Sequence, residues 1–329
     1  MKIFSKHTTI IISTLIITLI CAIIAIGLGS VNITIPDIFQ AIFTNDAAGK
    51  HVTIIRDIRL PRVLLALIIG ANLAISGALL QAVMGNPLAD PGLTGVTSGA
   101  AAFVLLIILV FPSYTQLIPI AAFIGGFIAA IIVYSLAWKK SGISPITIIL
   151  SGVAVNALCG GIIGYLTIIY SDQLPSAVQW LNGSLASKGT SALVMILPYS
   201  IIGWICSIFA IRKTNMIRMG DEVAINLGEN VHRIRILLSI LAVFLAAISV
   251  ATIGMIGFIG LIVPHMARLI VGSNYKHLLP MSMVLGAFVL LIADTLGRTA
   301  FKPLDMPAGI FMALIGAPYF LYLMRKRAF

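Results

Sequence analysis

The stretch RKTNMIRMGDEVAINLGENVHRIR, residues 212–235, is the longest polar island in an otherwise apolar sequence. Its centre has the pattern of a short amphipathic helix. Acidic residues lie where a helix dipole is positive, apolar residues share one face, and glycines lie at the two ends. These positions are Gly220, Asp221, Glu222, Val223, Ala224, Leu227 and Gly228. The residues are compatible with such a helix or with a solvated loop that contains a helical turn.

Basic residues flank this short helix on both sides. Arg212 and Lys213 precede it, and Arg233 and Arg235 follow it. Clustered Lys and Arg in a short connection mark the cytoplasmic side of a membrane protein. We therefore expect the island to face the cytoplasm and to contact a soluble partner.

The composition is that of an integral membrane protein. Of 329 residues, 60% are hydrophobic and 9% are charged, and the mean hydropathy is +1.12, whereas soluble domains are roughly half apolar. Apolar runs recur along the chain, so we expect one all-α transmembrane domain over residues 1–329, with about ten transmembrane helices. The ten segments are 8–28, 60–83, 92–111, 117–138, 143–168, 190–211, 233–254, 257–271, 278–297 and 307–324.

The distribution of basic residues predicts the orientation. With the first residues inside, 14 of the 21 Lys and Arg residues fall on the cytoplasmic side, and both termini are expected there. This topology explains the net charge of +11 without a nucleic acid partner. The lipid bilayer is the expected surrounding, and the cell membrane is the expected location.

Two connections on the cytoplasmic side are candidates for a gate. Gly85–Gly95 contains two prolines and three glycines, which forbid a continuous helix. Non-helical backbone at membrane depth is tolerated beside protein or a water-filled path, so this turn could close a pore opposite Ser144–Thr147. The residues alone favour the alternative of two ordinary connections.

Polar residues inside the apolar segments have ordinary structural explanations. Asn72 and Gln81 are expected to form interhelical hydrogen bonds. Asp294 and Arg298 stand four residues apart, as in a local ion pair. The glycines and the proline of residues 253–268 indicate a broken helix.

The connection over residues 171–189, expected outside, leaves two interpretations open. Trp180, with Tyr165 and Tyr170 nearby, is compatible with an anchor at the membrane interface. It is equally compatible with a mouth that faces a ligand.

Several functional patterns are absent from the sequence. It contains no phosphate-binding loop, no His-Glu-x-x-His, and no acidic residue in the middle of a helix for proton or sodium coupling. Cys21, Cys159 and Cys206 lack the spacing of a metal or redox site. We therefore expect no catalytic residue, no metal site and no cofactor on this chain.

Taken together, the motifs resemble the permease family of iron-siderophore, haem and cobalamin ABC importers, and look like the membrane subunit of the cobalamin importer. The matching stretches are RLPR (59–62), GALLQ (77–81), NPLADP (86–91), GVTSGA (95–100), GFIGLIVPHMAR (257–268) and GAP (316–318). The resemblance implies a type II importer fold with ten helices in each of two permeases, identical or homologous. It also implies two cytoplasmic ATPase subunits that bind ATP and Mg, and an extracytoplasmic substrate-binding protein.

The same resemblance implies roles for particular residues. It makes Gly220–Gly228 the coupling helix, within a coupling region of about 212–235, that sits in a cleft of the ATPase. The cytoplasmic gate elements would be Asn86, Leu88, Ser144, Pro145, Ile146 and Thr147. The residues that meet acidic side chains of the binding protein, on an exposed outer surface, would be Arg59, Arg62 and Arg298.

Two positions depart from the family pattern. Asp305-Met306-Pro307 stands where the family usually has Glu-Leu-Pro, and the turn at residues 144–147 matches weakly.

The leading functional expectation is an ATP-driven import permease for a ferric siderophore, with haem or cobalamin as alternative substrates. An ion-coupled secondary transporter and a membrane-embedded enzyme are the competing classes. The missing mid-membrane carboxylates argue against the first of these, and the missing catalytic patterns argue against the second.

Overall fold

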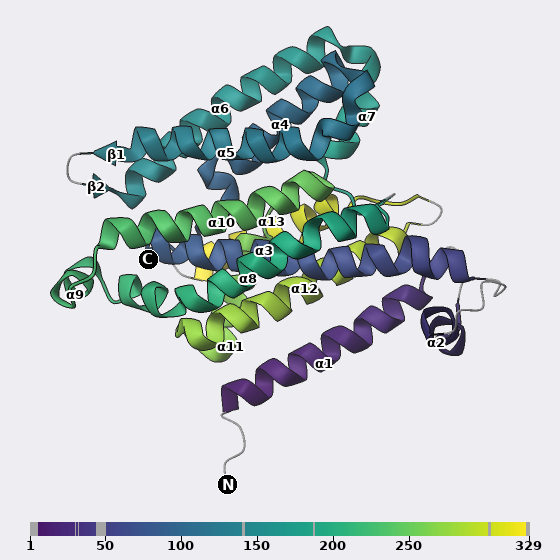
Figure 1. Cartoon of the computed structure of the whole chain (residues 1–329), viewed down its shortest axis with the longest axis horizontal. Helices are drawn as coiled ribbons and strands as arrows, with labels where there is room; N and C mark the ends of the chain where they lie inside the picture. The colour runs from purple at the N-terminus through teal and green to yellow at the C-terminus, as the bar shows by residue number, and fades with distance from the viewer. Residues whose placement is uncertain are drawn as a thin grey trace.

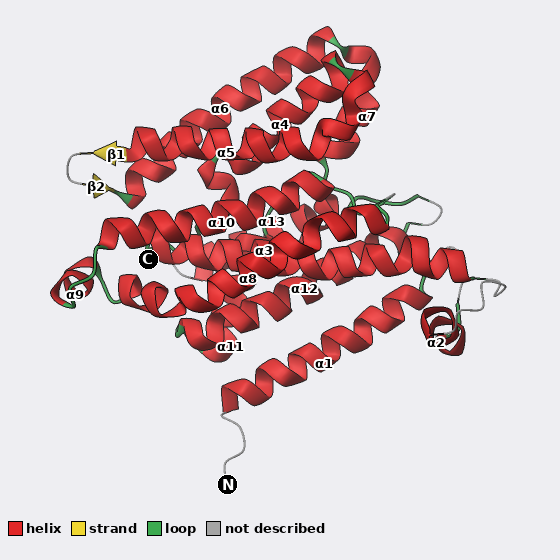
Figure 2. Ribbon diagram, viewed as in Figure 1, coloured by secondary structure: helices red, strands yellow, loops and turns green. Residues whose placement is uncertain are grey.

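The computed structural model describes residues 6–29, 31, 33–43, 51–139, 142–186, 188–301 and 304–326, and they are almost entirely helical (Figure 2). The α-helices are α1 (Lys6–Gly27), α2 (Ile35–Phe43), α3 (Leu60–Val83), α4 (Val96–Leu105), α5 (Ile118–Ala137), α6 (Pro145–Ile169), α7 (Leu174–Leu181), α8 (Thr190–Arg218), α9 (Asp221–Asn226), α10 (Val231–Ile253), α11 (Ile259–Val271), α12 (Tyr275–Thr299) and α13 (Ala308–Lys326). Short π-helical segments are η1 (Ile54–Arg59) and η3 (Leu106–Val110). Short 3₁₀ segments are η2 (Pro91–Thr94), η4 (Pro112–Leu117) and η5 (Ser171–Gln173). A two-residue hairpin joins β1 (Trp138–Lys139) to β2 (Gly142–Ile143), with Trp138 opposite Ile143.

Each of the ten predicted hydrophobic segments contains a helix, which confirms the all-α membrane fold. Within the described residues, seven helices are long and apolar enough to cross a membrane, and three apolar helices are shorter. The shorter ones are Val96–Val110, Ile259–Val271 and Ala308–Tyr322. That all ten cross the bilayer, and that both termini are cytoplasmic, stay predictions.

The helices form two layers (Figure 1). In the upper layer of that view, α4, α5 and α6 pack together, and α10 packs against α5 to join this layer to the rest. The lower layer is built around α3, which contacts α8, α10, α11 and α12. Along the lower edge, α1 packs against α12.

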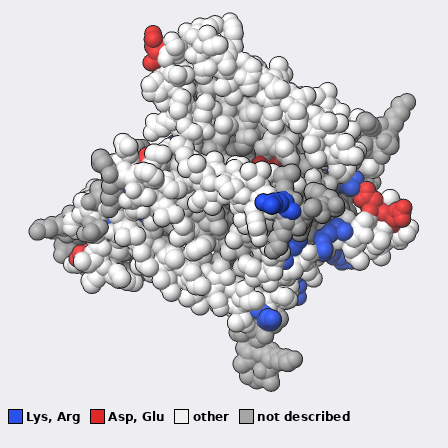
Figure 3. Space-filling view, turned by 180° about the vertical axis from the view of Figure 1, so that it is seen from behind, with Lys and Arg blue, Asp and Glu red and all other residues white. Residues whose placement is uncertain are grey.

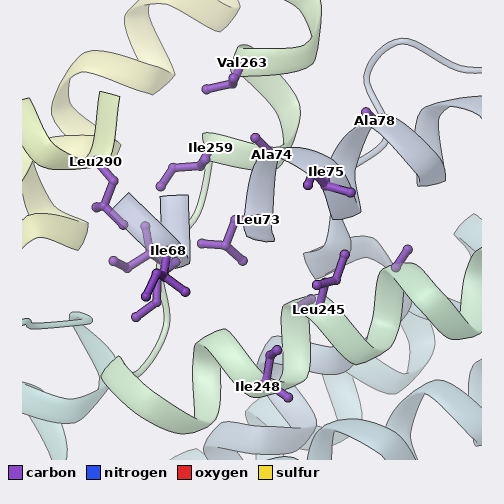
Figure 4. Packing of buried hydrophobic residues seen from close by; sticks show 14 of the residues in the cluster. Ile68, Leu73, Ala74, Ile75, Ala78, Leu245, Ile248, Ile259, Val263 and Leu290 are labelled. Atoms are coloured by element: carbon purple, nitrogen blue, oxygen red, sulfur yellow. The ribbon is translucent and has the colours of Figure 1, made fainter. Parts of the chain in front are cut away.

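Helix α3 is buried on all sides because its sequence is apolar all round and rich in small residues. Side chains from α10, α11 and α12, including Leu245, Ile259 and Leu290, surround its residues Ile68 and Leu73 (Figure 4). A helix that is hydrophobic all round is typical of a core position in a membrane bundle.

Glycines set the closest helix crossings. A Cβ atom on Gly77 would overlap the backbone carbonyl of Gly260 in α11, and a Cβ atom on Gly70 would overlap that of Gly286 in α12. Lipid tails are as apolar as side chains, so membrane helices associate through such close packing and through hydrogen bonds.

The expected interhelical hydrogen bonds are present. Asn72 of α3 donates to Ser200 Oγ at 2.8 Å and accepts from Trp204 Nε1 at 2.8 Å, both on α8. Gln81 accepts from Arg268 Nη2 at 2.9 Å and donates to the Leu261 carbonyl at 3.2 Å. These bonds satisfy polar groups that lipid could not.

The predicted break between residues 253 and 268 is confirmed. Helix α10 ends at Ile253, Gly254 adopts a φ of +84°, and α11 starts at Ile259. Gly254 is required here because a Cβ atom would overlap the carbonyl of Trp180. The break therefore sits directly against the end of α7.

The elements expected on each side of the membrane lie at opposite ends of the molecule. Helix α9 and the hairpin are at the left of Figure 1, and α2 and α7 are at the right. On the face in Figure 3, seen from behind, Lys and Arg gather toward the end that carries α9. This arrangement agrees with the positive-inside rule for the coupling region.

Candidate functional site

Residues 212–235 form a projecting helical corner at one end of the molecule (Figure 1). Helix α8 continues to Arg218, α9 covers Asp221–Asn226, and α10 starts at Val231. The short helix predicted from the sequence is therefore present, but several of the flanking basic residues lie in the last turns of α8 rather than in a loop. Basic side chains suit that position because the dipole of a helix is negative at its C-terminal end.

Two glycines set the path of the corner. Gly220 has a φ of +106° and Gly228 a φ of +79°, values that residues with a Cβ atom rarely adopt. No atom would contact a Cβ at either position, so the backbone angle is the reason for glycine. Each residue lies at one end of α9 and turns the chain sharply.

Two ion pairs hold this corner together. Arg235 Nη2 of α10 donates to Asp221 Oδ1 of α9 at 3.0 Å, and Lys213 of α8 pairs with Glu229 in the turn after α9. Exposed pairs of this kind contribute about 0–1 kcal/mol each, so they orient the helix more than they stabilise the fold.

Three apolar side chains of α9 and its C-terminal end are exposed. Val223 is 39% exposed, Ile225 60% and Leu227 59%. Of Val223, Ala224 and Leu227, which the sequence predicts on one face, Ala224 is fully buried. The exposed residues, with Met219 beside them, make a small patch suited to a protein partner.

The second candidate region is the turn after α3. Asn86 Oδ1 accepts from the Leu88 N–H at 2.9 Å, and Asp90 Oδ1 accepts from the Gly92 N–H at 2.8 Å and caps η2. The prediction of a non-helical but ordered turn is confirmed. Both Asn86 and Leu88 are half-buried.

One residue that sequence reasoning missed connects this turn to α6. Asn156 donates through Nδ2 to the Gly92 carbonyl at 3.0 Å and accepts from Ser98 Oγ at 2.5 Å. Close by, α6 approaches η2 so tightly that a Cβ atom on Gly152 would overlap the Leu93 carbonyl. Helix α6 and the turn are therefore joined by hydrogen bonds and by close backbone packing.

The third candidate region, Ser144–Thr147, is the start of α6 rather than a free turn. Ser144 is the N-cap residue, Pro145 occupies the first turn, and Ile146 is 68% exposed. Thr147 Oγ1 donates to the Ser144 carbonyl at 2.8 Å. Among the described residues, no hydrogen bond joins these four positions to Asn86 or Leu88. The connection runs through α6 and Asn156.

At the opposite end, Arg62 is buried in an ion-pair network. Its guanidinium donates to Asp294 at 2.8–3.1 Å and to Asp305 at 2.7–2.9 Å. Asp294 is 1% exposed and also lies 3.9 Å from Arg298 Nε. The local pair of Asp294 with Arg298 is thus confirmed, but Arg62 holds Asp294 more closely.

The other two arginines hold the end of α1. Arg59 donates to the carbonyls of Ile26 and Gly27 at 2.8 and 2.9 Å, and Arg298 donates to that of Leu28 at 2.9 Å. The last carbonyls of a helix have no partner within it, and a cation there also meets the negative end of the dipole.

The expectation that Arg59, Arg62 and Arg298 line an exposed outer surface was therefore wrong. Arg59 and Arg62 are buried, and the charged side chain of Arg298 is mostly covered. A buried charge without a partner is costly. The three arginines lie where the positive-inside rule predicts few basic residues, and their partners within the chain explain them. The acidic partners of Arg62, Asp294 and Asp305, are far from it in sequence.

These features define a class of protein: a multi-pass membrane transport subunit with a projecting apolar contact helix at one end. The chain belongs to the FecCD transport family, whose model matches residues 17–326. This confirms the family resemblance drawn from the motifs.

Relatives and a solved structure agree with this assignment. The chain is 41% identical to the Fe(3+)-citrate import system permease protein YfmE of Bacillus subtilis, over 95% of this chain and 93% of that one. It is 40% identical to the hemin transport system permease protein HmuU of Yersinia pestis, over 95% and 94%. A solved metal-chelate type ABC transporter in an inward-facing conformation matches with a TM-score of 0.86 and 31% identity, over 97% of this chain and 99% of that one. The chain is thus a permease of the cell membrane and not an enzyme.

Proposed function

We propose that this chain is the membrane-spanning subunit of an ABC importer that takes up a ferric siderophore delivered by an extracytoplasmic binding protein. The observation that carries the proposal is the set of exposed apolar side chains on α9, at the end of the molecule where basic residues gather. An isolated permease has no use for such a patch, whereas an ATPase that docks there would cover it.

The relatives support iron chelates as the substrate class. YfmE is described as importing Fe(3+)-citrate and HmuU as transporting hemin, and the chain is about equally similar to both. Import of haem or cobalamin by the same mechanism is the alternative substrate assignment.

A second permease, identical or homologous, is part of the proposal. Helix α6 at the edge of the upper layer exposes Leu158 and Ile168, and no described atom would contact a Cβ on Gly160, Gly161 or Gly164. Small residues on an uncovered helix face suit close packing against another helix. ATP and Mg would be bound by the two ATPase subunits, not by this chain.

An ion-coupled secondary transporter is the competing proposal. Asp294, the buried carboxylate of α12, is tied to Arg62 and is not free to exchange a cation. This arrangement favours the ATP-driven mechanism.

The test is reconstitution of the permease with its ATPase and binding protein in liposomes, with uptake of radioactive iron supplied as ferric citrate, a ferric trihydroxamate or hemin. We expect uptake of one of these chelates to require ATP on the side of the membrane where the ATPase is bound. Uptake that persists without ATPase and follows an imposed ion gradient would overturn the proposal.

A further inference from the structure

A cavity of about 260 Å³, lined by both polar and apolar residues, lies beside α7. Helix α7 is at the end of the molecule opposite α9 (Figure 1). The lining of the cavity comes from α7, from the loop that follows, from η3 and from the end of α10. The lining residues are Ile108, Ser176, Gln179, Trp180, Ser184, Ala186, Lys188 and Ile253. At about 30 Å³ for each water molecule, the cavity has room for much more than a single water.

The backbone around the cavity is held firmly. The Ser184 N–H donates to the Ile253 carbonyl at 2.8 Å, and the Gly309 N–H donates to the Gly183 carbonyl at 3.1 Å. These bonds attach the loop after α7 to α10 and to α13. The polar side chains of the cavity are therefore presented by a fixed frame.

Trp180 also lines the cavity and is 9% exposed. Among the described residues its indole Nε1 has no hydrogen-bond partner, but this nitrogen has almost no accessible surface. Trp180 is therefore a wall of the cavity and a reporter of what binds there, and the polar contacts come from the other lining residues.

Lys188 is the charged residue of the lining, and no Asp or Glu lines the cavity with it. Within the described part of the chain, its ammonium group forms no hydrogen bond or ion pair. Burial lowers the pKa of Lys188, and no carboxylate nearby acts in the opposite direction. The positive charge of Lys188 is therefore not balanced by an acidic side chain in the lining of this cavity.

Ser176 and Gln179 lie one turn apart on the same side of α7 as Trp180, and both are exposed. They can donate to a ligand and leave the cavity open to it. The Ser184 hydroxyl oxygen accepts from the Ala186 N–H at 3.1 Å, so its own hydrogen is free to point inward. The lining thus includes possible donors in Lys188, Ser176, Gln179 and Ser184.

We propose that this cavity binds a carboxylate group of the iron chelate as the chelate enters the permease. A carboxylate accepts only, carries one negative charge and has several lone pairs, which matches one ammonium together with several neutral donors. The inference rests on the proposed function and narrows its substrate to chelates with a free carboxylate, such as citrate complexes. Neutral trihydroxamate chelates offer no group for Lys188.

The first test measures binding without transport. The purified permease in lipid nanodiscs is titrated with iron-free citrate, and tryptophan fluorescence is recorded for the wild type and for Trp180→Phe. We expect a saturable change in the wild type that disappears in Trp180→Phe. We also expect Lys188→Gln to weaken binding at least tenfold, and Lys188→Arg, which keeps the charge, to stay within a few fold of the wild type.

Lys276→Gln is the matched control, because it removes an exposed lysine at the start of α12 and leaves the cavity intact. Size-exclusion profiles of all variants check folding. Citrate binding by Lys188→Gln with the affinity of the wild type would overturn the inference, as would the absence of any citrate-dependent change in a folded wild type.

The second test separates the chelate from the other source of a carboxylate, an acidic side chain of the binding protein. Docking of the chelate-free binding protein to wild type and Lys188→Gln is compared. Equal affinities support the chelate as the source, whereas a tenfold loss in Lys188→Gln would assign the carboxylate to the binding protein and overturn the proposal. If the reconstituted wild type imports no iron chelate, the proposed function fails, and the citrate titration still reports on the cavity itself.

Discussion

Arg62 of α3 binds Asp294 of α12 through both carboxylate oxygens, with Nη2 to Oδ1 at 2.8 Å and Nε to Oδ2 at 2.9 Å. The pair joins residues that are 232 positions apart in the chain. Asp305 completes the network from the segment before α13. Three parts of the chain therefore meet at one guanidinium group.

We expect Arg62→Met to destabilise the protein strongly, because it leaves Asp294 buried without its main partner. Breaking one side of a buried pair costs about 3–5 kcal/mol. The double variant Arg62→Met with Asp294→Asn should recover part of the loss, since no uncompensated charge remains there. The measurement is thermal unfolding of the purified permease, and a single variant as stable as the wild type would contradict the structural role.

The same contacts change the interpretation of charge reversal at this end. Replacement of Arg59, Arg62 and Arg298 by Glu should disrupt the end of α1 and the Arg62 network before it affects any docking surface. Loss of binding-protein docking in that variant is informative only if its unfolding temperature equals that of the wild type.

Gly77 provides a prediction about helix packing. We expect Gly77→Val to lower the unfolding midpoint by roughly 5 °C or more, because the side chain would force α3 away from the Gly260 carbonyl of α11. Gly257→Ala is the matched control, since no atom would contact a Cβ there. Equal midpoints for both variants would show that this crossing is not tightly packed.

On α9, we expect Leu227→Asp to leave the permease folded and to weaken its association with the ATPase at least tenfold. Leu227 is 59% exposed, so a charge there has little folding cost, but it would be buried in an interface. Leu227→Met keeps the apolar surface and should bind normally. The measurement is copurification and substrate-stimulated ATP hydrolysis, and normal values for Leu227→Asp would remove α9 from the interface.

Gly228→Pro tests the shape of the same corner. Proline requires a φ near −65°, whereas Gly228 has +79°. We expect normal membrane insertion with loss of uptake, because only the corner is distorted. Uptake at the wild-type rate would mean that the backbone conformation after α9 is not required for transport.

The features that sequence reasoning predicted are those with a local signal. The ten apolar segments follow from length and composition, and α9 follows from a polar island with acidic residues at its start. The partners of Arg62 had no such signal, because Asp294 and Asp305 are brought to it only by the packing of α3 against α12. The same applies to Asn156, whose role depends on the close approach of α6 to η2.

Helix α2 was missed for a different reason. Its nine residues are too few to span a bilayer, and only the helical spacing of its apolar residues Ile38, Ala41 and Ile42 distinguishes it from a loop. A search for short amphipathic segments within the connections would have found it.

The turn after α3 predicts a pH dependence. Burial raises the pKa of Asp90 to about 6, while the hydrogen bond from the Gly92 N–H acts in the opposite direction. In the unfolded chain the carboxyl group has a pKa of about 4. Between this pKa and the pKa in the folded state, the folded state binds more protons than the unfolded state. The contribution of Asp90 to stability is therefore greatest at acidic pH and falls as the pH rises through this window.

We expect Asp90→Asn, which keeps an acceptor for the Gly92 N–H, to raise the unfolding midpoint at pH 7.5. The difference from the wild type should shrink toward pH 4. Asp172→Asn, at an exposed position of η5, is the control and should show no such trend. An Asp90→Asn variant that is less stable than the wild type at pH 7.5 would contradict the sign.

The last prediction concerns Asn86 and Leu88 as moving parts of the cytoplasmic gate. Both lie in a turn that is ordered by its own hydrogen bonds and tied to α6 through Asn156, so a shift of α6 during the ATP cycle should change their exposure. Cysteines at 86 or 88, in a background without Cys21, Cys159 and Cys206, should react with a cytoplasmic thiol reagent at rates that differ at least several-fold with and without nucleotide. Asn156→Leu removes the connection and should reduce that difference, while Asn182→Leu, at a half-buried asparagine at the other end, should not. Labelling rates that are equal in both nucleotide states would mean that the turn is a fixed part of the scaffold, and the gate would then have to lie elsewhere on α6.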